Sequence, residues 1–388
     1  MSAEANTPIR VALVGLGSYG RSHLSRLRGM AQNNRIKVVA LSEMNQDNIA
    51  LVRETLDELQ IKVYEQADVM FKELSGKVDL VILPVGIAQH APLTVAALEC
   101  GHNVLVEKPL AGSVAEGEKI VEAEKRCPGF VAVGYQNAYT RECLEAKKLI
   151  LSGVLGRVKK ISGLAFMPRG TNYYTRNPWV GKLMVNGLPV YDSPLNNAAA
   201  HVVNLGLFFA GCGAVDQVAR AVDAEGVLYR ANDIESFDSA AVRWTTEENI
   251  PVNILVSHTV WDAYNPELTV ECENGKIIYQ LNGVTCATDN TGKVIYQSCA
   301  AAYSSELYDS VFKRISDPSA YIYTPEMALE QSAAIELMHK KIDIVQVPAE
   351  SCQVRPDDGI IQVKLQPWYW RAAYIMGCLP AEIGWEIK

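Results

Sequence analysis

The sequence predicts an α/β protein with a doubly wound parallel sheet near its N-terminus and a large, mostly antiparallel sheet after it. The length of 388 residues exceeds what one core usually fills, so we expect two domains. Short apolar runs alternate with helical patterns as far as about residue 138, as parallel strands with crossover helices require. Beyond Val158, long β-branched and aromatic runs are joined by short turns, which is typical of antiparallel strands.

The first element is an apolar strand over Ile9–Val14, followed at once by a glycine turn and a helical pattern. Gly15 supplies the positive φ that so tight a turn needs, Gly17 leaves room for a pyrophosphate, and Gly20 lets the helix pack close to the strand. The helix N-terminus then presents free N–H groups and its positive dipole end to phosphates. We therefore predict a dinucleotide-binding turn. Its expected contacts are Gly15, Gly17, Ser18, Tyr19 and Gly20.

A second apolar run, 37–41, ends at Ser42 and Glu43. Glu43 lies 23 residues beyond Gly20, close to the spacing of an acid that binds the cofactor ribose. A carboxylate there accepts from the 2′-hydroxyl and repels a 2′-phosphate, which favours NAD, while Ser42 keeps NADP as the alternative. A glycine turn of this kind also occurs in domains that bind nothing, and the acid is what favours a cofactor.

The remaining elements divide the chain into three parts. Up to residue 138, further strands are expected at 78–83, 103–106 and 130–133, with helices at 47–60, 92–100 and 114–127. The second domain, 139–345, is expected to hold helices at 140–152, 197–210 and 324–341 and strands at 158–167, 214–222, 237–245, 251–260, 267–272, 276–280 and 293–298. Residues 346–388 are aromatic-rich and read as an extension packed on the body.

Composition excludes several classes of function. Hydrophobic residues make up 49% and charged residues 21%, and the net charge of −8 is spread without long blocks, so we expect no nucleic-acid partner. The first residues do not resemble a signal peptide and no apolar stretch approaches 18 residues, which predicts a cytoplasmic protein with no membrane partner. The nine cysteines form no C-x-x-C pair, and no cluster has metal-ligand spacing, so we expect reduced cysteines and no metal.

Ligands of an open parallel sheet lie beyond the carboxyl ends of its strands, so residues directly after strands are the candidates for chemistry. Pro84 and His90 follow one predicted strand, Glu107 and Lys108 the next, and Gln136 the last. From position alone, Lys108 could equally be a surface lysine paired with Glu107.

These segments together resemble the glucose-fructose oxidoreductase, inositol dehydrogenase and MocA (Gfo/Idh/MocA) family. The resemblance rests on the glycine turn, the strand that leads to Pro84 and His90, and the tripeptide Glu107-Lys108-Pro109, and it extends from about Ile9 to Lys341. It implies a Rossmann domain followed by an α/β domain with an open-faced sheet, and NAD(P)-dependent oxidation or reduction of sugars, cyclitols or related polyols. It also implies cofactor contacts at Pro84, His90, Glu107, Lys108 and Gln136. Lys108 would contact the substrate hydroxyl and help relay its proton.

The family's other mark is an aspartate four residues before a histidine on a helix. Here Asn197 stands where the aspartate is expected and His201 is retained, while Asn204 stands where a second acid often follows. A histidine can take the hydroxyl proton and an asparagine cannot, so His201 is the predicted base. Asn197 could orient the substrate through its amide, or its presence could mark a site that lost turnover. His201 could also be a packed histidine with a backbone partner.

Between these marks lies a loop rich in aromatic and guanidinium groups. Aromatic rings suit the apolar faces of a sugar, and arginines suit hydroxyls or a carboxylate, so the loop is a predicted substrate site. The predicted contacts are Arg169, Tyr173, Tyr174, Arg176 and Trp179, together with Lys108, Asn197 and His201. Subunit packing is the alternative for this loop. His258 is expected to be packed, and His23 to serve packing or phosphate contacts.

The sequence thus predicts an NAD-dependent oxidoreductase that acts on a secondary alcohol of a sugar, sugar acid or cyclitol. Two alternatives stay open at this point: a redox-elimination enzyme that cleaves glycosidic bonds, and a sugar or nucleotide sensor without turnover. A large apolar sheet face is rarely left to water, and relatives join such faces, so a homodimer or homotetramer through the open sheet is expected.

Overall fold

The computed structural model describes residues 8–299 and 305–387, except for the side chain of Ser18, and these fall into two compact units. The first unit comprises the chain up to Ala111, residues 115–134 and residues 308–326, and the second comprises the rest. The expected boundary at residue 138 therefore lies at 134, and residues 308–326 leave the predicted second domain. They do so because Tyr308 hydrogen-bonds His23, and the Tyr323 carbonyl accepts from the backbone N–H of Val133 at 2.8 Å.

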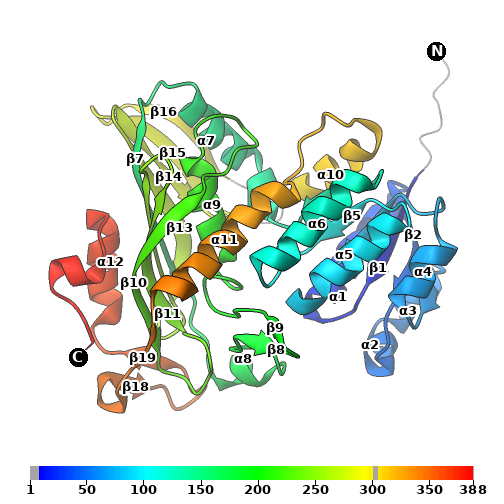
Figure 1. The fold of residues 1–388 in the computed structure, drawn as a ribbon, viewed down its shortest axis with the longest axis horizontal. Helices are drawn as coiled ribbons and strands as arrows, with labels where there is room; N and C mark the ends of the chain where they lie inside the picture. Colours follow the sequence, from blue (N-terminus) through cyan, green and yellow to red (C-terminus); the bar gives the residue numbers. More distant parts are fainter. Residues whose placement is uncertain (1–7, 300–304, 388) are drawn as a thin grey trace. The chain divides into compact units, whose positions relative to one another are not determined.

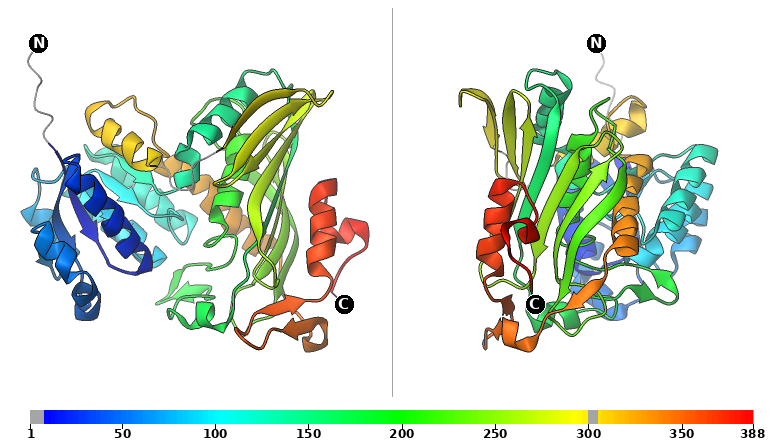
Figure 2. Two further views of the ribbon diagram at one scale, coloured as in Figure 1. Left: turned by 180° about the vertical axis from the view of Figure 1, so that it is seen from behind. Right: turned by 60° about the vertical axis from the view of Figure 1, so that its left-hand side comes forward.

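The first unit holds a six-stranded, wholly parallel sheet in the order β3-β2-β1-β4-β5-β6. Its strands are β1 Ile9–Val14, β2 Ile36–Ser42, β3 Lys62–Tyr64, β4 Leu80–Leu83, β5 Val104–Val106 and β6 Val131–Val133. The helices of this region are α1 Ser18–Gln32, α2 Gln46–Leu51, α3 Arg53–Glu58, α4 Ala67–Glu73, η1 Ile87–Gln89, α5 His90–Glu99, α6 Val114–Arg126 and α10 Glu306–Ser316. Figures 1 and 2 show α5 and α6 on one face of the sheet and α1 on the other. The doubly wound sheet is thus confirmed.

The strand order of this sheet reverses between β1 and β4. Ligands of doubly wound folds bind at such a switch point, outside the carboxyl ends of the strands. The strands β4, β5 and β6 are wholly apolar, and Leu13, Ile82 and Leu105 are fully buried, because helices cover both faces of the sheet.

The second unit is built on a nine-stranded sheet in the order β16-β15-β14-β13-β7-β12-β11-β10-β17. Its strands are β7 Val158–Phe166, β10 Ala221–Arg230, β11 Ser239–Thr246, β12 Pro251–Ser257, β13 Tyr264–Cys272, β14 Gly275–Gln280, β15 Val284–Asp289, β16 Val294–Cys299 and β17 Ile344–Gln346. The neighbours are antiparallel except for the pairs β7–β12 and β10–β17, which confirms a mostly antiparallel sheet. The strand expected at 214–222 begins at Ala221 instead, and β15 was missed because its residues are mostly small or polar.

Helices cover one face of this second sheet. Figures 1 and 2 show α11, Pro325–Lys341, along that face, and α9, Ala200–Ala210, packs against β7, β12 and β13. Every residue of α9 is buried. A Cβ at Gly163 would lie 2.8 Å from a methyl group of Val202, so glycine there lets α9 approach the sheet closely. The smaller elements are η2 Gln136–Tyr139, α7 Arg141–Leu151, α8 Thr171–Thr175, β8 Met184–Val185, β9 Leu188–Pro189, η3 Ala349–Ser351, β18 Cys352–Val354 and β19 Ile361–Val363.

The C-terminal segment covers part of the opposite face. The helix α12, Gln366–Met376, and the turn η4, Pro380–Ile383, place Trp370 and Trp385 in one buried cluster with Phe166 and other side chains of the sheet. The face that was expected to be open is therefore covered over its centre by the chain itself, whereas β16 at the sheet's edge stays exposed.

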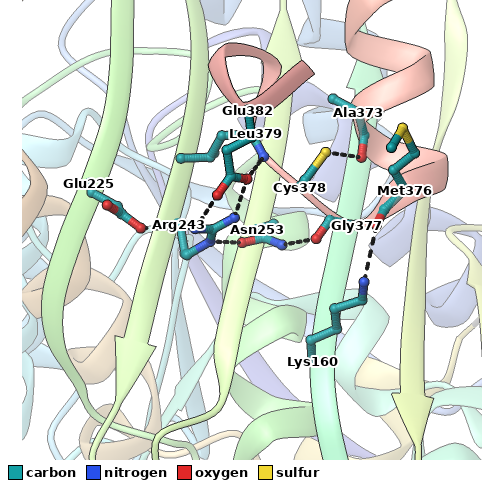
Figure 3. A network of polar contacts seen from close by, with 10 residues as sticks. All are labelled: Lys160, Glu225, Arg243, Asn253, Ala373, Met376, Gly377, Cys378, Leu379 and Glu382. Carbon is teal, nitrogen blue, oxygen red and sulfur yellow. Dashed lines mark hydrogen bonds and ion pairs between the residues drawn. The ribbon is translucent and has the colours of Figure 1, made fainter. Parts of the chain in front are cut away.

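Polar contacts fasten this segment to the sheet, as Figure 3 shows. Arg243 of β11 pairs with Glu382 at 2.6 Å, and the Asn253 amide donates to the Gly377 carbonyl at 2.9 Å. Lys160 of β7 donates to the Met376 carbonyl at 3.1 Å. These contacts hold the last turn of α12 and the residues after it, which is the packing on the body that the sequence suggested.

Candidate active site

The glycine turn has a geometry that separates the roles of its three glycines. Gly15 has φ +88° and donates its N–H to the Ser42 carbonyl at 2.8 Å, and a Cβ at Gly20 would lie 2.3 Å from the Gly15 oxygen. The fold itself therefore requires both of these glycines. A Cβ at Gly17 would meet nothing within 4 Å, so packing within the protein does not explain this glycine. The open surface above Gly17 fits a pyrophosphate that needs the backbone bare.

The start of α1 also suits an anion. Gly17 is its N-cap, no side chain caps the helix, and no acidic residue lies in its first turn. The positive end of the helix is thus left for a ligand. Tyr19 is partly exposed and packs its ring against His23 at 5.2 Å, whereas the side chain of Ser18 lies outside the described residues.

Glu43 stands beside this turn at the end of β2. Its carboxylate accepts from the backbone N–H of Leu16 at 2.7 Å and from that of Asn45 at 2.8 Å. These bonds fix an acid next to the glycine turn, which is the place from which a carboxylate meets a ribose hydroxyl. The residues of the first unit therefore fit a dinucleotide.

His90 holds the segment that contains Lys108. Its Nδ1 lies 2.7 Å from the Pro109 carbonyl and its Nε2 lies 3.2 Å from the Val85 carbonyl. Burial lowers the pKa of His90, so the ring is neutral and carries one N–H, which the shorter contact assigns to Nδ1. His90 thus binds the chain beside Lys108, and Pro84, at the end of β4, packs near Gly20.

Glu107 belongs to a buried chain of hydrogen bonds. Its Oε1 lies 3.0 Å from His23 Nε2, and His23 Nδ1 lies 2.6 Å from the hydroxyl of Tyr308. Burial raises the pKa of Tyr308, so its hydroxyl donates to Nδ1 and His23 donates to Glu107. The other carboxylate oxygen of Glu107 accepts from the Lys108 N–H at 3.2 Å. Glu107 and His23 are thus engaged with the protein and position the backbone of Lys108, whose side chain is half-buried.

Gly134 makes room for this carboxylate. A Cβ at Gly134 would lie 2.7 Å from the Glu107 oxygen. Gln136, the predicted cofactor contact two residues later, begins η2 in the second unit. Its buried Oε1 accepts no hydrogen bond from the residues that the structure describes.

Asn197 lies in the turn before α9, because the helix begins at Ala200, three residues later than the sequence suggested. Its Nδ2 donates to Asp192 Oδ1 at 2.8 Å, and Asp192 Oδ2 accepts from the Gly181 N–H at 2.7 Å. Sequence reasoning missed Asp192, although a carboxylate five residues before the asparagine was visible. Position 197 holds an asparagine instead of an acid, but the carboxylate of Asp192 lies in contact with it.

His201 occupies the first turn of α9. The ring is buried and meets Tyr135 edge to face at 5.6 Å. Tyr135 in turn donates its hydroxyl to Gln331 of α11 at 3.0 Å, and Asn204 is buried one turn further along α9. The ring of His201 is therefore held by packing within the second unit.

Lys147 of α7 caps the other end of α9. Its fully buried Nζ donates to the carbonyls of Phe208, Gly211 and Gln217. The carbonyls at a helix C-terminus have no partner within the helix, and a cation suits the negative end of its dipole. Sequence reasoning missed this lysine, since it lies in an ordinary helical pattern.

The predicted substrate loop forms a compact group with His258, which we call the Tyr173 cluster: Arg169, Tyr173, Tyr174, Arg176 and His258. The guanidinium carbons of Arg176 and Arg169 lie 3.9 and 5.0 Å from the centre of the Tyr173 ring, and the His258 ring lies 5.4 Å from it. Trp179 is half-buried and lies three residues beyond Arg176, the C-cap of helix α8. His258 was expected to be a packed residue, and here it is packed against predicted substrate contacts.

The described residues meet the requirements of neither a helical membrane span nor a metal site. None of its helices has the length and apolar character that a membrane span needs. The nine cysteines are free, and no group of histidines, cysteines and acids within residues 8–299 and 305–387 could hold a metal ion.

The first unit, with its parallel sheet, glycine turn and ribose-type acid, has the architecture of a dinucleotide-binding domain of oxidoreductases. Residues 9–135 match the model of the Gfo/Idh/MocA oxidoreductase family, which describes an NAD-binding Rossmann fold. Inositol 2-dehydrogenase of Serratia proteamaculans is 30% identical over 186 residues, which are 48% of this chain and 51% of that protein. The inositol 2-dehydrogenase/D-chiro-inositol 3-dehydrogenase of Halalkalibacterium halodurans is 26% identical over 48% of this chain and 49% of its own length. The chain thus spans about half the length of these relatives.

Solved structures share the fold over more of the chain. The WlbA dehydrogenase of Bordetella pertussis, in complex with NADH and UDP-GlcNAcA, has a TM-score of 0.68 at 18% identity and covers 86% of this chain and 96% of its own. A 3-ketoreductase of Actinomadura kijaniata, in complex with NADP, has a TM-score of 0.68 at 15% identity, with 88% of this chain and 100% of its own covered. The likeness confirms a Rossmann sheet followed by a large, mostly antiparallel sheet.

Proposed function

We propose that the protein is an NAD(P)-dependent oxidoreductase that transfers a hydride between nicotinamide and a secondary alcohol of a sugar, sugar acid or cyclitol. The observation that carries the proposal is the bare backbone at Gly17, next to an uncapped helix start and the carboxylate of Glu43. The family match of residues 9–135 and the names of the inositol dehydrogenase relatives support it.

Lys108 and His201 are the proposed chemical groups. Bound nicotinamide would supply the hydride acceptor or donor. Lys108, held through Glu107 and His90, would polarise the substrate oxygen, and His201 would exchange its proton. A histidine titrates near neutral pH, so it serves as base in one direction and as acid in the other.

Asn197 has a narrower proposed role. Its Nδ2 is committed to Asp192, so its amide oxygen is the group through which it would accept a hydrogen bond from a substrate hydroxyl. The asparagine would therefore orient the substrate, as a family aspartate also could, while proton transfer is left to His201.

For the cofactor we favour NAD over NADP. The carboxylate of Glu43 is fixed beside the turn by backbone N–H groups, where its charge would oppose a 2′-phosphate. Substituting Glu43→Ala is expected to reduce the preference for NAD, which the ratio of kcat/KM values for the two cofactors measures.

The test is the formation of NADH, followed by absorbance, with sugars, sugar acids and cyclitols as candidate substrates. Lys108→Met and His201→Asn should each lower kcat about a hundredfold to ten-thousandfold, while NADH binding, read by fluorescence, is retained. Lys119→Met, at an exposed lysine of the first unit, is the matched control and should leave both readings unchanged. If both variants kept wild-type rates, or if no candidate in the panel reduced NAD or NADP, the proposal would be wrong.

A further inference from the structure

The Tyr173 cluster gathers at one edge of the second sheet. The strands β7 and β12 are parallel neighbours with Phe166 opposite Ser257, so the residues that follow them emerge side by side. Arg169 follows β7 and donates its backbone N–H to the carbonyl of His258, which follows β12, at 3.2 Å. The register of the sheet therefore fixes the two sides of the cluster relative to each other.

Two positive charges in the cluster have no acid in contact with them. Arg169 and Arg176 form no ion pair with any residue that the structure describes, and both guanidinium groups lie near the ring of Tyr173. Two carboxylates lie near the cluster and are engaged with other residues: Asp192 with Gly181 and Asn197, and Asp238 with Ala231 and Asn232. The charge of the two arginines is thus uncompensated by direct contact.

Two buried nitrogen atoms of the cluster, one in His258 and one in Arg169, have no hydrogen-bond partner among the described residues. His258 Nδ1 lies 3.1 Å from the hydroxyl of Tyr174. Burial, and then the charges of Arg169 and Arg176, lower the pKa of His258, while burial raises the pKa of Tyr174. Nδ1 and the tyrosine hydroxyl are therefore both neutral and share one hydrogen bond, which leaves Nε2 as the second polar atom of the ring. Among the described residues, neither His258 Nε2 nor Arg169 Nε has a hydrogen-bond partner, although both atoms are buried.

A pocket adjoins the cluster. It has a volume of about 530 Å³, within the range of small-molecule sites. Tyr174 and Arg176 of the cluster line it, with Lys182 and Asp233 among the other residues, whereas Arg169, Tyr173 and His258 lie behind this lining. Lys182 is paired with Glu235 at 2.7 Å, so Arg176 is the lining cation without such a partner. Asp233 also lines the pocket, and its negative charge would repel the carboxylate of a bound acid.

We propose that the Tyr173 cluster recognises a carboxylate, so that the substrate is a sugar acid rather than a neutral sugar or cyclitol. A carboxylate offers two acceptor oxygens and a negative charge, which match the buried Nε–H of Arg169 and the planar guanidinium groups of both arginines. A hydroxyl could accept from one of these donors but would leave both charges unmatched. The inference rests on the proposed function in that the bound acid is taken to be the substrate.

The test compares the affinities of acids and of their neutral partners, without relying on turnover. The full-length protein with saturating NAD is titrated calorimetrically with D-glucuronate and D-glucose, and with D-galacturonate and D-galactose. At least one acid should bind about tenfold to a hundredfold more tightly than its partner. Arg176→Gln and Arg169→Gln should each weaken the acid at least tenfold and the neutral sugar less than threefold. Arg157→Gln, which removes an exposed arginine paired with Glu273 outside the pocket and the cluster, should change neither affinity more than twofold.

The inference is overturned if no acid binds, if each acid binds no better than its partner, or if the arginine variants weaken both members of a pair equally. A failure of the proposed function looks different. Acid binding that depends on Arg169 and Arg176 without any NADH formation would leave the recognition site in place and remove the oxidoreductase. NADH formation without discrimination between acid and neutral sugar would support the oxidoreductase and rule out the carboxylate site.

Discussion

Restoring the family's aspartate at position 197 should damage this protein, because Asp192 already supplies a carboxylate there. In Asn197→Asp, the new carboxylate oxygen would take the place of an amide nitrogen that lies 2.8 Å from Asp192 Oδ1. Two unit charges at 2.8 Å repel by about 6 kcal/mol at an effective dielectric constant of about 20. One proton retained by the pair lowers this repulsion, as happens when two carboxylates lie close together.

The cost of that proton sets the expected size of the effect. Holding a proton at pH 7.5 on an aspartate with an ordinary pKa of about 3.9 costs about 5 kcal/mol, at about 1.4 kcal/mol for each pH unit. We therefore expect Asn197→Asp to lower the free energy of unfolding by about 4 to 5 kcal/mol at pH 7.5 and by about 1.5 kcal/mol at pH 5. The sign follows because the shared proton raises a pKa in the folded state, so the penalty is absent below the unfolded pKa and grows as pH rises.

Urea unfolding at the two pH values measures both numbers. The swapped double variant Asp192→Asn with Asn197→Asp keeps one carboxylate and one amide, so it should recover most of the loss. Asn197→Ala, which removes the hydrogen bond without adding a charge, should cost about 1 to 3 kcal/mol with little dependence on pH. The reasoning is refuted if Asn197→Asp is as stable as the wild type at pH 7.5, if its loss is equal at both pH values, or if the swap is no better than the single variant.

Two further predictions concern stability away from Asn197. Burial raises the pKa of Glu124 to about 7, so the protonated form stabilises the fold at low pH and this stability is lost as pH rises from about 4.5 to 7. Urea unfolding should give Glu124→Gln the same free energy of unfolding as the wild type near pH 4.5 and a value higher by about 2 to 3 kcal/mol at pH 8. The amide oxygen of the variant can still accept from the Val131 N–H. If the difference in the free energy of unfolding between Glu124→Gln and the wild type were the same at both pH values, the prediction for Glu124 would be wrong. Lys147→Met should lower the free energy of unfolding by about 3 kcal/mol, because three buried carbonyls lose their donor. It should also lower kcat by disturbing the helix of His201. Lys148→Met, at the exposed neighbouring lysine, should change the free energy of unfolding by no more than about 0.5 kcal/mol. Equal effects of the two lysine variants would rule out the capping role.

The local elements of the first unit could be predicted from the sequence because each has a strong local cause. Gly15 and Gly20 are demanded by a single tight turn, and the buried parallel strands appear as uninterrupted apolar runs. The helix over Pro325–Lys341 was also visible in advance, since a threonine and a proline mark its start.

The parts that sequence reasoning missed depend on contacts between distant residues. Tyr308 reaches His23 across 285 positions, and Lys147 reaches the end of α9 from another helix. Neither contact leaves a local pattern, because a tyrosine or a lysine in a helix is unremarkable until its neighbour is known. His258 was undervalued for the same reason, since it becomes part of a candidate site through the pairing of β7 with β12.

The place of residues 308–326 in the first unit has a consequence for how the chain folds during synthesis. These residues are made after every strand of the second sheet except β17. When residue 134 leaves the ribosome, the six parallel strands are complete, but His23 has yet to meet Tyr308 and the Val133 N–H has yet to meet its carbonyl. The segment at Lys108 therefore gains its supports late, so a nascent chain stalled before residue 308 should hold the sheet without the finished support of this segment.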